Sequence, residues 1–200
     1  MTNILVLYYS THGSTRNLAR SIASGIEQAG ANAIIRTVAP ISASQQNNTS
    51  SIITNNDPIV QKHDLQNCDG LALGAPTRFG QMPAAMKYFW DSTSAEWLQG
   101  ALVDKPACAF TSSSSLHGGQ EATLLSMIVP LLHHGMLVLG IPYTEPQLHS
   151  TQTGGTPYGA SHVAGMEQQQ QLSKDEKELC IALGKRLALS AIKLTTHRSV

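Results

Sequence analysis

The stretch that decides the fold is Ile4-Leu5-Val6-Leu7-Tyr8-Tyr9-Ser10-Thr11-His12-Gly13-Ser14-Thr15. An apolar run gives way to small hydroxyl residues around a glycine, and an amphipathic helical pattern follows at residues 17–28. A buried strand that leads into a helix N-terminus can bind phosphate, because the helix dipole and the free backbone N–H groups point at the anion. We therefore expect an anion-binding loop made of Ser10, Thr11, His12, Gly13, Ser14 and Thr15.

Two familiar nucleotide motifs are missing from this loop. No lysine follows Gly13, so the Walker pattern of nucleotide triphosphate enzymes is absent, and the chain contains no G-x-G-x-x-G dinucleotide fingerprint. What remains is a set of hydroxyl and backbone donors suited to a single phosphomonoester. The plainer alternative is a Ser/Thr helix cap with a turn glycine, and the loop alone does not decide between the two.

Composition narrows the class of protein further. The 200 residues contain 13 Lys plus Arg and 13 Asp plus Glu, and this zero net charge argues against a nucleic-acid partner. The three cysteines lie far apart, which fits neither a disulfide framework nor a metal site, so we expect no bound metal and a reducing compartment. Without a signal peptide or a membrane-length apolar run, the expected location is the cytoplasm, with no stable membrane insertion.

Apolar runs alternate with helical patterns along the chain. Strands are predicted at residues 4–9, 33–38, 70–74, 107–110 and 136–139. Helices are predicted at residues 17–28, 83–94, 120–134 and 173–193. Residues 39–57 are expected to form an exposed loop, and residues 141–171 show no clear element. This alternation predicts one α/β domain over residues 1–200, a five-stranded parallel sheet with helices on both faces in three layers.

In such a sheet, ligands bind at the carboxyl ends of the strands, which points to two more loops. The second loop is Pro76-Thr77-Arg78-Phe79-Gly80, and the third is Thr111-Ser112-Ser113-Ser114-Ser115-Leu116-His117-Gly118-Gly119. Each could be an ordinary solvated turn. Together with the first loop they suit a ligand with one phosphate and a flat polar ring, and flavin mononucleotide (FMN) is such a molecule.

Several motifs carry a resemblance to a known family. They are Leu5-Val6-Leu7-Tyr8-Tyr9-Ser10, Gly74-Ala75-Pro76-Thr77-Arg78-Phe79-Gly80, Gly118-Gly119-Gln120-Glu121, Leu132-His133-His134-Gly135-Met136 and Gly154-Gly155-Thr156-Pro157-Tyr158-Gly159-Ala160. The first motif and the strand order resemble flavodoxin-like proteins. The last two motifs are absent from generic flavodoxins and resemble the tryptophan-repressor-binding-protein (WrbA) family of NAD(P)H:quinone oxidoreductases.

The resemblance implies an FMN-dependent enzyme that uses NADH or NADPH and reduces quinones by two electrons, with ping-pong hydride transfer through the flavin. It implies that residues 10–15 hold the FMN phosphate. Contacts to the flavin ring are implied for Thr77, Arg78 and Phe79, and along its other edge for Ser112, Ser113, Ser114, Ser115, Leu116, His117 and Gly118.

The resemblance also implies residues that act on substrate. His133 would reach the flavin or the quinone as the candidate catalytic residue, and Trp97 would form the pocket wall where quinone and nicotinamide stack. In the family this wall is shared between subunits of a homotetramer, and residues 141–171 correspond to an insertion near the active site. His12 departs from the family's usual aromatic residue, so it is a candidate for either phosphate or nicotinamide.

Two other classes of protein remain open at this stage. An electron-carrier flavodoxin would share the fold, although such carriers are typically acidic so that basic partners dock by charge. A non-enzymatic regulatory protein could also retain the fold, and an intact phosphate loop argues against it.

Overall fold

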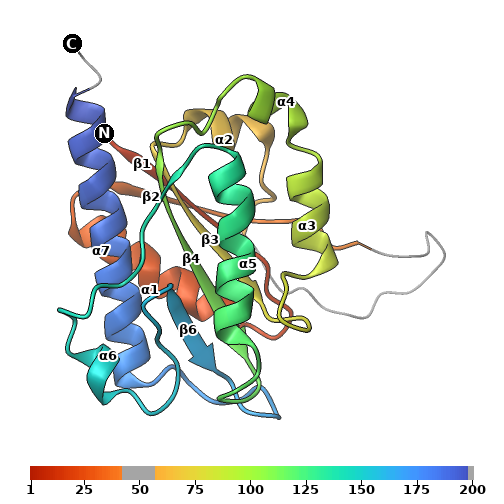
Figure 1. Ribbon diagram of the computed structural model, residues 1–200, viewed down its shortest axis with the longest axis vertical. Coiled ribbons are helices and arrows are strands. Elements are labelled where there is room, and N and C mark those ends of the chain that lie inside the picture. Colours follow the sequence, from red (N-terminus) through yellow and green to blue (C-terminus); the bar gives the residue numbers. More distant parts are fainter. Residues whose placement is uncertain (42–56, 198–200) are drawn as a thin grey trace.

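The computed structural model describes residues 1–41 and 57–197, and its centre is a parallel sheet (Figure 1). The strands are β1 Asn3–Tyr8, β2 Asn32–Thr37, β3 Gly70–Pro76, β4 Pro106–Ser113, β5 Leu137–Val138 and β6 Ala160–Val163. The path through the sheet is β2-β1-β3-β4-β5, with β6 paired to β4. This is the flavodoxin-like order, so the predicted fold class is confirmed.

Helices cover both faces of the sheet (Figure 1). They are α1 Ser14–Gln28, α2 Lys62–Asn67, α3 Ala84–Asp91, α4 Ser94–Leu98, α5 Gln120–His133, α6 Gln147–Ser150 and α7 Lys174–His197. The side chains of β1 alternate between two cores, because successive residues of a strand point to opposite faces. Ile4 and Val6 pack with α1 and α7, whereas Leu5 and Leu7 pack with α3 and α5.

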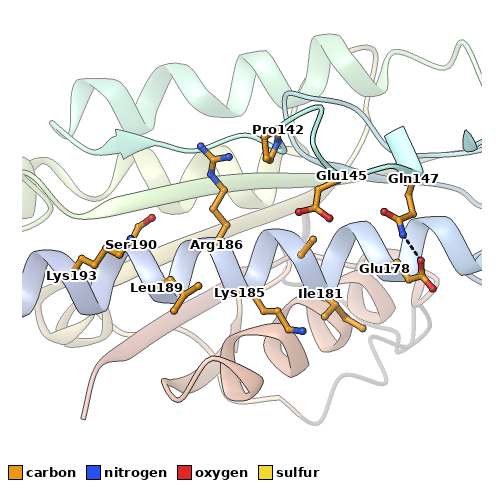
Figure 2. A pocket seen from close by; sticks show the side chains of 11 residues that line it. Pro142, Glu145, Gln147, Glu178, Ile181, Lys185, Arg186, Leu189, Ser190 and Lys193 are labelled. Carbon is orange, nitrogen blue, oxygen red and sulfur yellow. Dashed lines mark hydrogen bonds between the residues drawn. The ribbon is translucent and has the colours of Figure 1, made fainter. Parts of the chain in front are cut away.

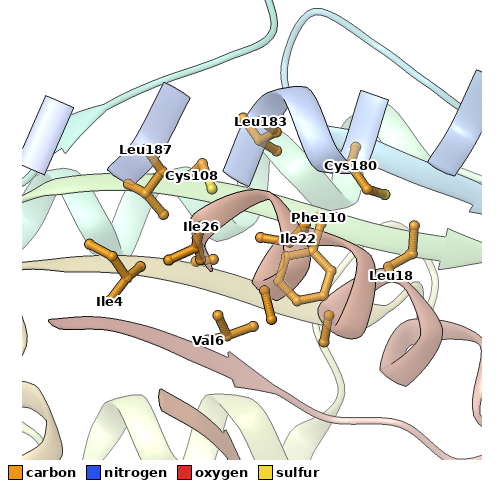
Figure 3. Close-up of a cluster of buried hydrophobic side chains, with 14 of the residues drawn as sticks. Ile4, Val6, Leu18, Ile22, Ile26, Cys108, Phe110, Cys180, Leu183 and Leu187 are labelled. Atoms are coloured by element: carbon orange, nitrogen blue, oxygen red, sulfur yellow. The ribbon is translucent and has the colours of Figure 1, made fainter. Parts of the chain in front are cut away.

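The core on the α1/α7 side is drawn in Figure 3. Leu18, Ile22 and Ile26 of α1 are fully buried there. They pack over the sheet together with Leu183 and Leu187 of α7. Leu18, Ile22 and Ile26 recur at every fourth position, the spacing that puts an apolar stripe on one side of a helix.

A reciprocal pair of glycines lets α1 and α7 approach closely. A Cβ atom on Gly25 would lie 2.2 Å from the carbonyl oxygen of Ile181 on α7. A Cβ atom on Gly184 would likewise lie 2.2 Å from the carbonyl oxygen of Ile22 on α1. Neither position has room for a side chain, so the spacing of the two helices is set by backbone against backbone.

Several element boundaries differ from the sequence expectation. The first helix begins at Ser14 rather than at residue 17, because Gly13 already supplies the turn. The helix expected at 83–94 is two helices, α3 and α4, because the chain turns at Ser92 and Thr93. The strand expected at 136–139 is only two residues long, Leu137–Val138. Helix α5 continues through Pro130 and ends at His133.

Three short elements were not predicted. Residues 141–171 contain α6 and β6, so this segment was wrongly expected to lack regular structure. Helix α2 was also missed, because its six residues are too few to show a period. Most of the loop predicted at residues 39–57 lies outside the described residues.

Candidate functional site

A cavity of about 280 Å³ lies where β1, β3 and β4 end. It therefore occupies the carboxyl edge of the sheet, where the sequence predicted a ligand. Ten residues line it: Ser10, Thr11, His12, Ser14, Thr15, Pro76, Arg78, Ser112, Met166 and Gln168. Five of these come from the first loop, so the structure brings most of the predicted phosphate residues to one space.

The backbone at the start of α1 is shaped by Gly13. Its φ of +96° lies in the left-handed region, which favours glycine because a Cβ atom is strained there. The Gly13 N–H donates to Ser10 Oγ at 3.0 Å, which folds the loop back on itself. No side chain caps this helix start within the described structure, so its first N–H groups stay available to an anion beside Ser14 and Thr15.

The charge of the cavity lining favours an anion. Arg78 lies across the opening and donates to Thr11 Oγ1 at 3.3 Å and to the Thr77 carbonyl oxygen at 2.9 Å. His12 is exposed at the rim. Among the described residues that line the cavity there is no carboxylate, so a phosphate there would meet hydroxyl, guanidinium and backbone donors.

Hydrogen bonds fix the third loop against the first. The hydroxyls of Thr15 and Ser112 lie 2.9 Å apart in the buried floor of the cavity. Ser113 donates to the Ser115 carbonyl oxygen at 2.7 Å, which turns the chain out of β4. Ser114 instead accepts a hydrogen bond from Gln168, so it lies next to the cavity without lining it.

The far end of the third loop borders a second, wider cavity. Leu116 and His117 line this space of about 530 Å³ together with Gly119, Gln120, Glu121, Ala122, Thr151, Thr153, Gly155, Thr156 and Ser161. Of the predicted third-loop residues, Ser112 therefore lines the first cavity and Leu116 and His117 line the second, whereas Ser113, Ser114, Ser115 and Gly118 line neither. The Gly118 N–H donates to the Ser115 carbonyl oxygen at 3.2 Å and closes the turn between them.

The second loop forms a tight turn that presents a bare aromatic ring. Arg78 and Gln81 exchange two backbone hydrogen bonds of 2.8 and 3.0 Å, and the Gly80 N–H donates to Thr77 Oγ1 at 3.3 Å. Phe79 sits at the tip with a φ of +53° and is fully exposed. An apolar ring held out in a strained turn suits contact with a flat ligand.

Sequence reasoning missed Met166 and Gln168, which close the cavity from the segment after β6. Both belong to residues 164–170, which we call the strap. The strap carries no helical or strand period, so its residues could not be placed from the sequence alone. Another missed group is the Tyr8 hydroxyl, which donates to Asp57 Oδ2 at 2.6 Å, while Arg20 pairs with Asp57 Oδ1 at 2.5 Å.

Trp97 and His133 lie next to each other, away from the anion cavity. The Trp97 Nε1–H donates to the His133 carbonyl oxygen at 2.8 Å. Both lie near the start of β4, since the Asp104 N–H donates to the Gly135 carbonyl oxygen at 3.0 Å. The cavity lies at the other end of this eight-residue strand, roughly 25 Å away at about 3.3 Å per residue.

Another open cavity, of about 570 Å³, lies along α7 and is separate from the predicted loops. Figure 2 shows Lys185 and Arg186 pointing in opposite directions across this groove. Because the cations do not converge, the groove does not offer one anion-binding point. Gln147 donates to Glu178 at 2.5 Å at its end, which ties α6 to α7.

Two further properties limit the chemistry of the described residues. They contain no group of three or more His, Cys, Asp or Glu side chains arranged to hold a metal ion. Nor does any helix among residues 1–41 and 57–197 combine the length and apolarity that crossing a membrane requires.

Sequence comparison gives the strongest link to known proteins. Residues 2–145 match the family described as NADPH-dependent FMN reductase. A protein of Gluconacetobacter diazotrophicus named NAD(P)H dehydrogenase (quinone) is 40% identical, covering 98% of this chain and 100% of that protein. A protein of the same name from Chromohalobacter salexigens is also 40% identical, covering 97% of this chain and 99% of that protein.

Structural comparison supports the fold. A crystal structure described as a flavodoxin, WrbA-like protein from Agrobacterium tumefaciens superposes with a TM-score of 0.69 at 22% identity, covering 96% of this chain and 99% of that chain. A flavodoxin from the domain Archaea gives a TM-score of 0.62 at 19% identity over 96% of this chain and 99% of that chain.

Proposed function

The chain belongs to the NADPH-dependent FMN reductase family, with relatives named NAD(P)H dehydrogenase (quinone) along its whole length, and we propose that it is an FMN-dependent NAD(P)H:quinone oxidoreductase. The observation that carries this proposal is the cavity at the carboxyl edge. It combines an uncapped helix start with hydroxyl donors and Arg78, and no carboxylate lines it among the described residues. That donor set fits the phosphate of FMN.

We assign the phosphate to the first loop and the flavin ring to the second and third, except that Arg78 of the second loop is assigned to the phosphate instead of the ring, because its guanidinium lies against Thr11. Ser10, Ser14 and Thr15 would donate their hydroxyls and backbone N–H groups to the phosphate, while Arg78 would neutralise part of its charge. Phe79 would cover one edge of the ring, and the loop between Ser112 and Gly118 would line the other. FMN held there would supply hydride transfer between the nicotinamide and the quinone.

The protein's contribution is to orient substrates and exclude water. The exposed ring of Phe79 offers an apolar surface against which a flat substrate can stack. His12 lies at the rim, where its imidazole can meet either the phosphate or the nicotinamide. His133 is the proposed residue for placing, or protonating, a quinone oxygen. Because His133 lies at the opposite edge of the sheet, it would have to come from a second copy of the chain.

The surface around His133 suits such an assembly. Leu125, Val129 and Leu132 form an exposed apolar stripe along α5, and Trp97 and Leu98 continue it on α4. We propose that this face packs against another copy in a homotetramer and so brings His133 and Trp97 to a neighbouring flavin. Analytical ultracentrifugation tests this, and a monomer at micromolar concentration would contradict it.

A cytoplasmic location is part of the proposal. It is supported by Cys68, Cys108 and Cys180, which are free and buried. Burial also raises the pKa of all three thiols, Cys68 to about 11 and Cys108 to about 12, so they stay protonated and unreactive at neutral pH.

Two measurements on the purified protein test the enzyme assignment. The first is the absorbance spectrum with identification of the released cofactor, where we expect FMN in equimolar amount. The second is a steady-state assay with NADH or NADPH and benzoquinone. Flavin without quinone turnover would indicate an electron carrier, and protein that cannot be reconstituted with FMN would indicate a regulatory role.

A further inference from the structure

A buried ion pair lies behind the cavity, and the residues just described do not account for it. His162 on β6 is 2% exposed, and Glu176 in the first turn of α7 is 1% exposed. His162 Nδ1 lies 2.8 Å from Glu176 Oε2. Charged groups this deep in a protein are retained only when they are fully paired, so the function of this pair needs an explanation.

The partners of Glu176 show that it is ionised. Its two oxygens accept backbone N–H groups from Gly154 at 2.8 Å, Val163 at 3.1 Å and Ser173 at 2.8 Å, besides His162. Burial acts to raise the pKa of Glu176, but the hydrogen bonds from His162 and from the Ser173 backbone outweigh it and lower the pKa to about 2. At neutral pH both carboxylate oxygens therefore only accept hydrogen bonds.

The second ring nitrogen of His162 also faces an acceptor. Nε2 lies 3.1 Å from the Gln170 carbonyl oxygen, which has no proton to give. A neutral imidazole has one N–H, so it could satisfy only one of these two partners. Both partners are satisfied when each ring nitrogen carries a proton, with Nδ1 donating to Glu176 and Nε2 donating to Gln170.

Gln170 ends the strap, so this contact joins the strap to β6 and, through Glu176, to α7. The strap also closes on itself, because the Gln170 N–H donates to the Ala164 carbonyl oxygen at 3.1 Å. At its middle, Gln168 donates to Ser114 Oγ at 2.7 Å and lines the anion cavity. Gln168 has a φ of +57°, an unfavourable conformation for this residue that is kept only where the surroundings hold it.

We infer that His162 is a positioning residue for the cofactor: as an imidazolium between Glu176 and Gln170, it holds the strap so that Gln168 closes the phosphate side of the cavity. The inference rests on the proposed function, since it takes the cavity to be the FMN site. Loss of the Nε2–H donor would leave the Gln170 carbonyl oxygen without this partner, and the strap would be released.

The groups around the pair leave His162 as the donor in both contacts. Glu176 is ionised at neutral pH, and the buried Cys180 thiol, one turn further along α7, stays protonated because its pKa is raised by burial and then by Glu176. The strap itself presents the Gln170 carbonyl oxygen, which can only accept. Removing the imidazole therefore removes the donor that joins the strap to Glu176.

The experiment measures the FMN dissociation constant by quenching of flavin fluorescence at pH 7. It compares the wild-type chain with His162→Gln and with His63→Gln, an exposed histidine on α2 as the matched control. We expect His162→Gln to raise the dissociation constant about tenfold, the loss of roughly one charged hydrogen bond, and the control to leave it unchanged.

The ratio of variant to wild-type dissociation constants should be about ten for His162→Gln and about one for His63→Gln. A ratio near one for His162→Gln overturns the inference. Failure of the wild type to bind FMN is distinct, because it refutes the proposed function.

A second variant covers the case in which His162→Gln does not fold. Gln168→Gly removes the bond to Ser114 but relieves the strained φ, so thermal stability should not fall, while the FMN dissociation constant should rise about tenfold. Gln169→Gly, in the same strap, is the control for added chain flexibility. Equal FMN affinity in Gln168→Gly and Gln169→Gly overturns the inference.

Discussion

Replacing Gly13 by alanine tests whether the backbone at the start of α1 holds the cofactor. The φ of +96° is accessible to glycine, whereas alanine is strained there by about 1–2 kcal/mol. No steric clash is expected, because a Cβ atom added at Gly13 would lie 3.4 Å from its nearest neighbour, the flexible guanidinium of Arg16. For a chain of this size, the strain lowers the melting temperature by roughly 2–8 °C.

The effect on FMN should be larger than the effect on stability. Relaxing φ toward negative values turns the N–H groups of Ser14 and Thr15 away from the cavity. Each hydrogen bond to a charged group contributes about 1.5–3 kcal/mol. Losing one of them raises the FMN dissociation constant about tenfold or more. Flavin fluorescence titration of the unliganded protein measures the constant, and thermal unfolding without FMN measures the strain.

Gly30 provides a matched control. It has a φ of +86° at the other end of α1, and no atom would lie within 4 Å of a Cβ atom added there, so Gly30→Ala carries a similar strain without a clash. We expect both variants to lose similar stability and only Gly13→Ala to lose FMN affinity. Equal FMN affinity in the two variants would refute the assignment of the α1 start as the phosphate site.

Other predictions address the substrate side, the ion pair and the assembly. His133→Ala should lower quinone turnover and leave flavin content intact, and unchanged turnover would remove His133 from the mechanism. The pKa of Glu176, lowered from 4.5 to about 2, contributes about 3 kcal/mol above pH 4.5 that is lost as pH falls to 2. Urea unfolding should therefore show a shallower pH slope below 4.5 in Glu176→Gln, and an unaltered slope would disprove this. Val129→Glu should yield smaller species by ultracentrifugation that retain FMN but lose turnover, and an intact oligomer would contradict the α5 interface.

The parts of the fold with strong local patterns were predictable. The buried run at residues 4–9 and the four-residue period of Leu18, Ile22 and Ile26 each predict one element without reference to the rest of the chain. The start of the helix predicted at residues 173–193 likewise rests on near neighbours, because the Glu176 N–H donates to Ser173 Oγ at 3.1 Å and the Ser173 N–H donates to Glu176 Oε2 at 2.8 Å. These features depend on neighbours in the sequence, which is why they could be found there.

The unpredicted parts depend on contacts between distant residues. Strand β6 exists because its residues pair with the end of β4, and four residues do not show a period of their own. Gln168 reaches the cavity through Ser114, and Tyr8 finds Asp57, across chain separations that no local pattern encodes. The position of the three loops at one edge of the sheet could therefore be predicted from the sequence. The closure of the cavity by Met166 and Gln168 of the strap could not.

The glycine contacts between α1 and α7 carry a consequence for folding kinetics. Gly25 and Gly184 lie almost at opposite ends of the described chain, and contacts of such sequence separation form slowly because the loop between them must close first. Glu176 and the strap can take their places only after α7 has docked on α1. In a refolding experiment the return of secondary structure should consequently precede the return of flavin affinity. Recovery of FMN binding would then indicate that α1 and α7 have packed against each other.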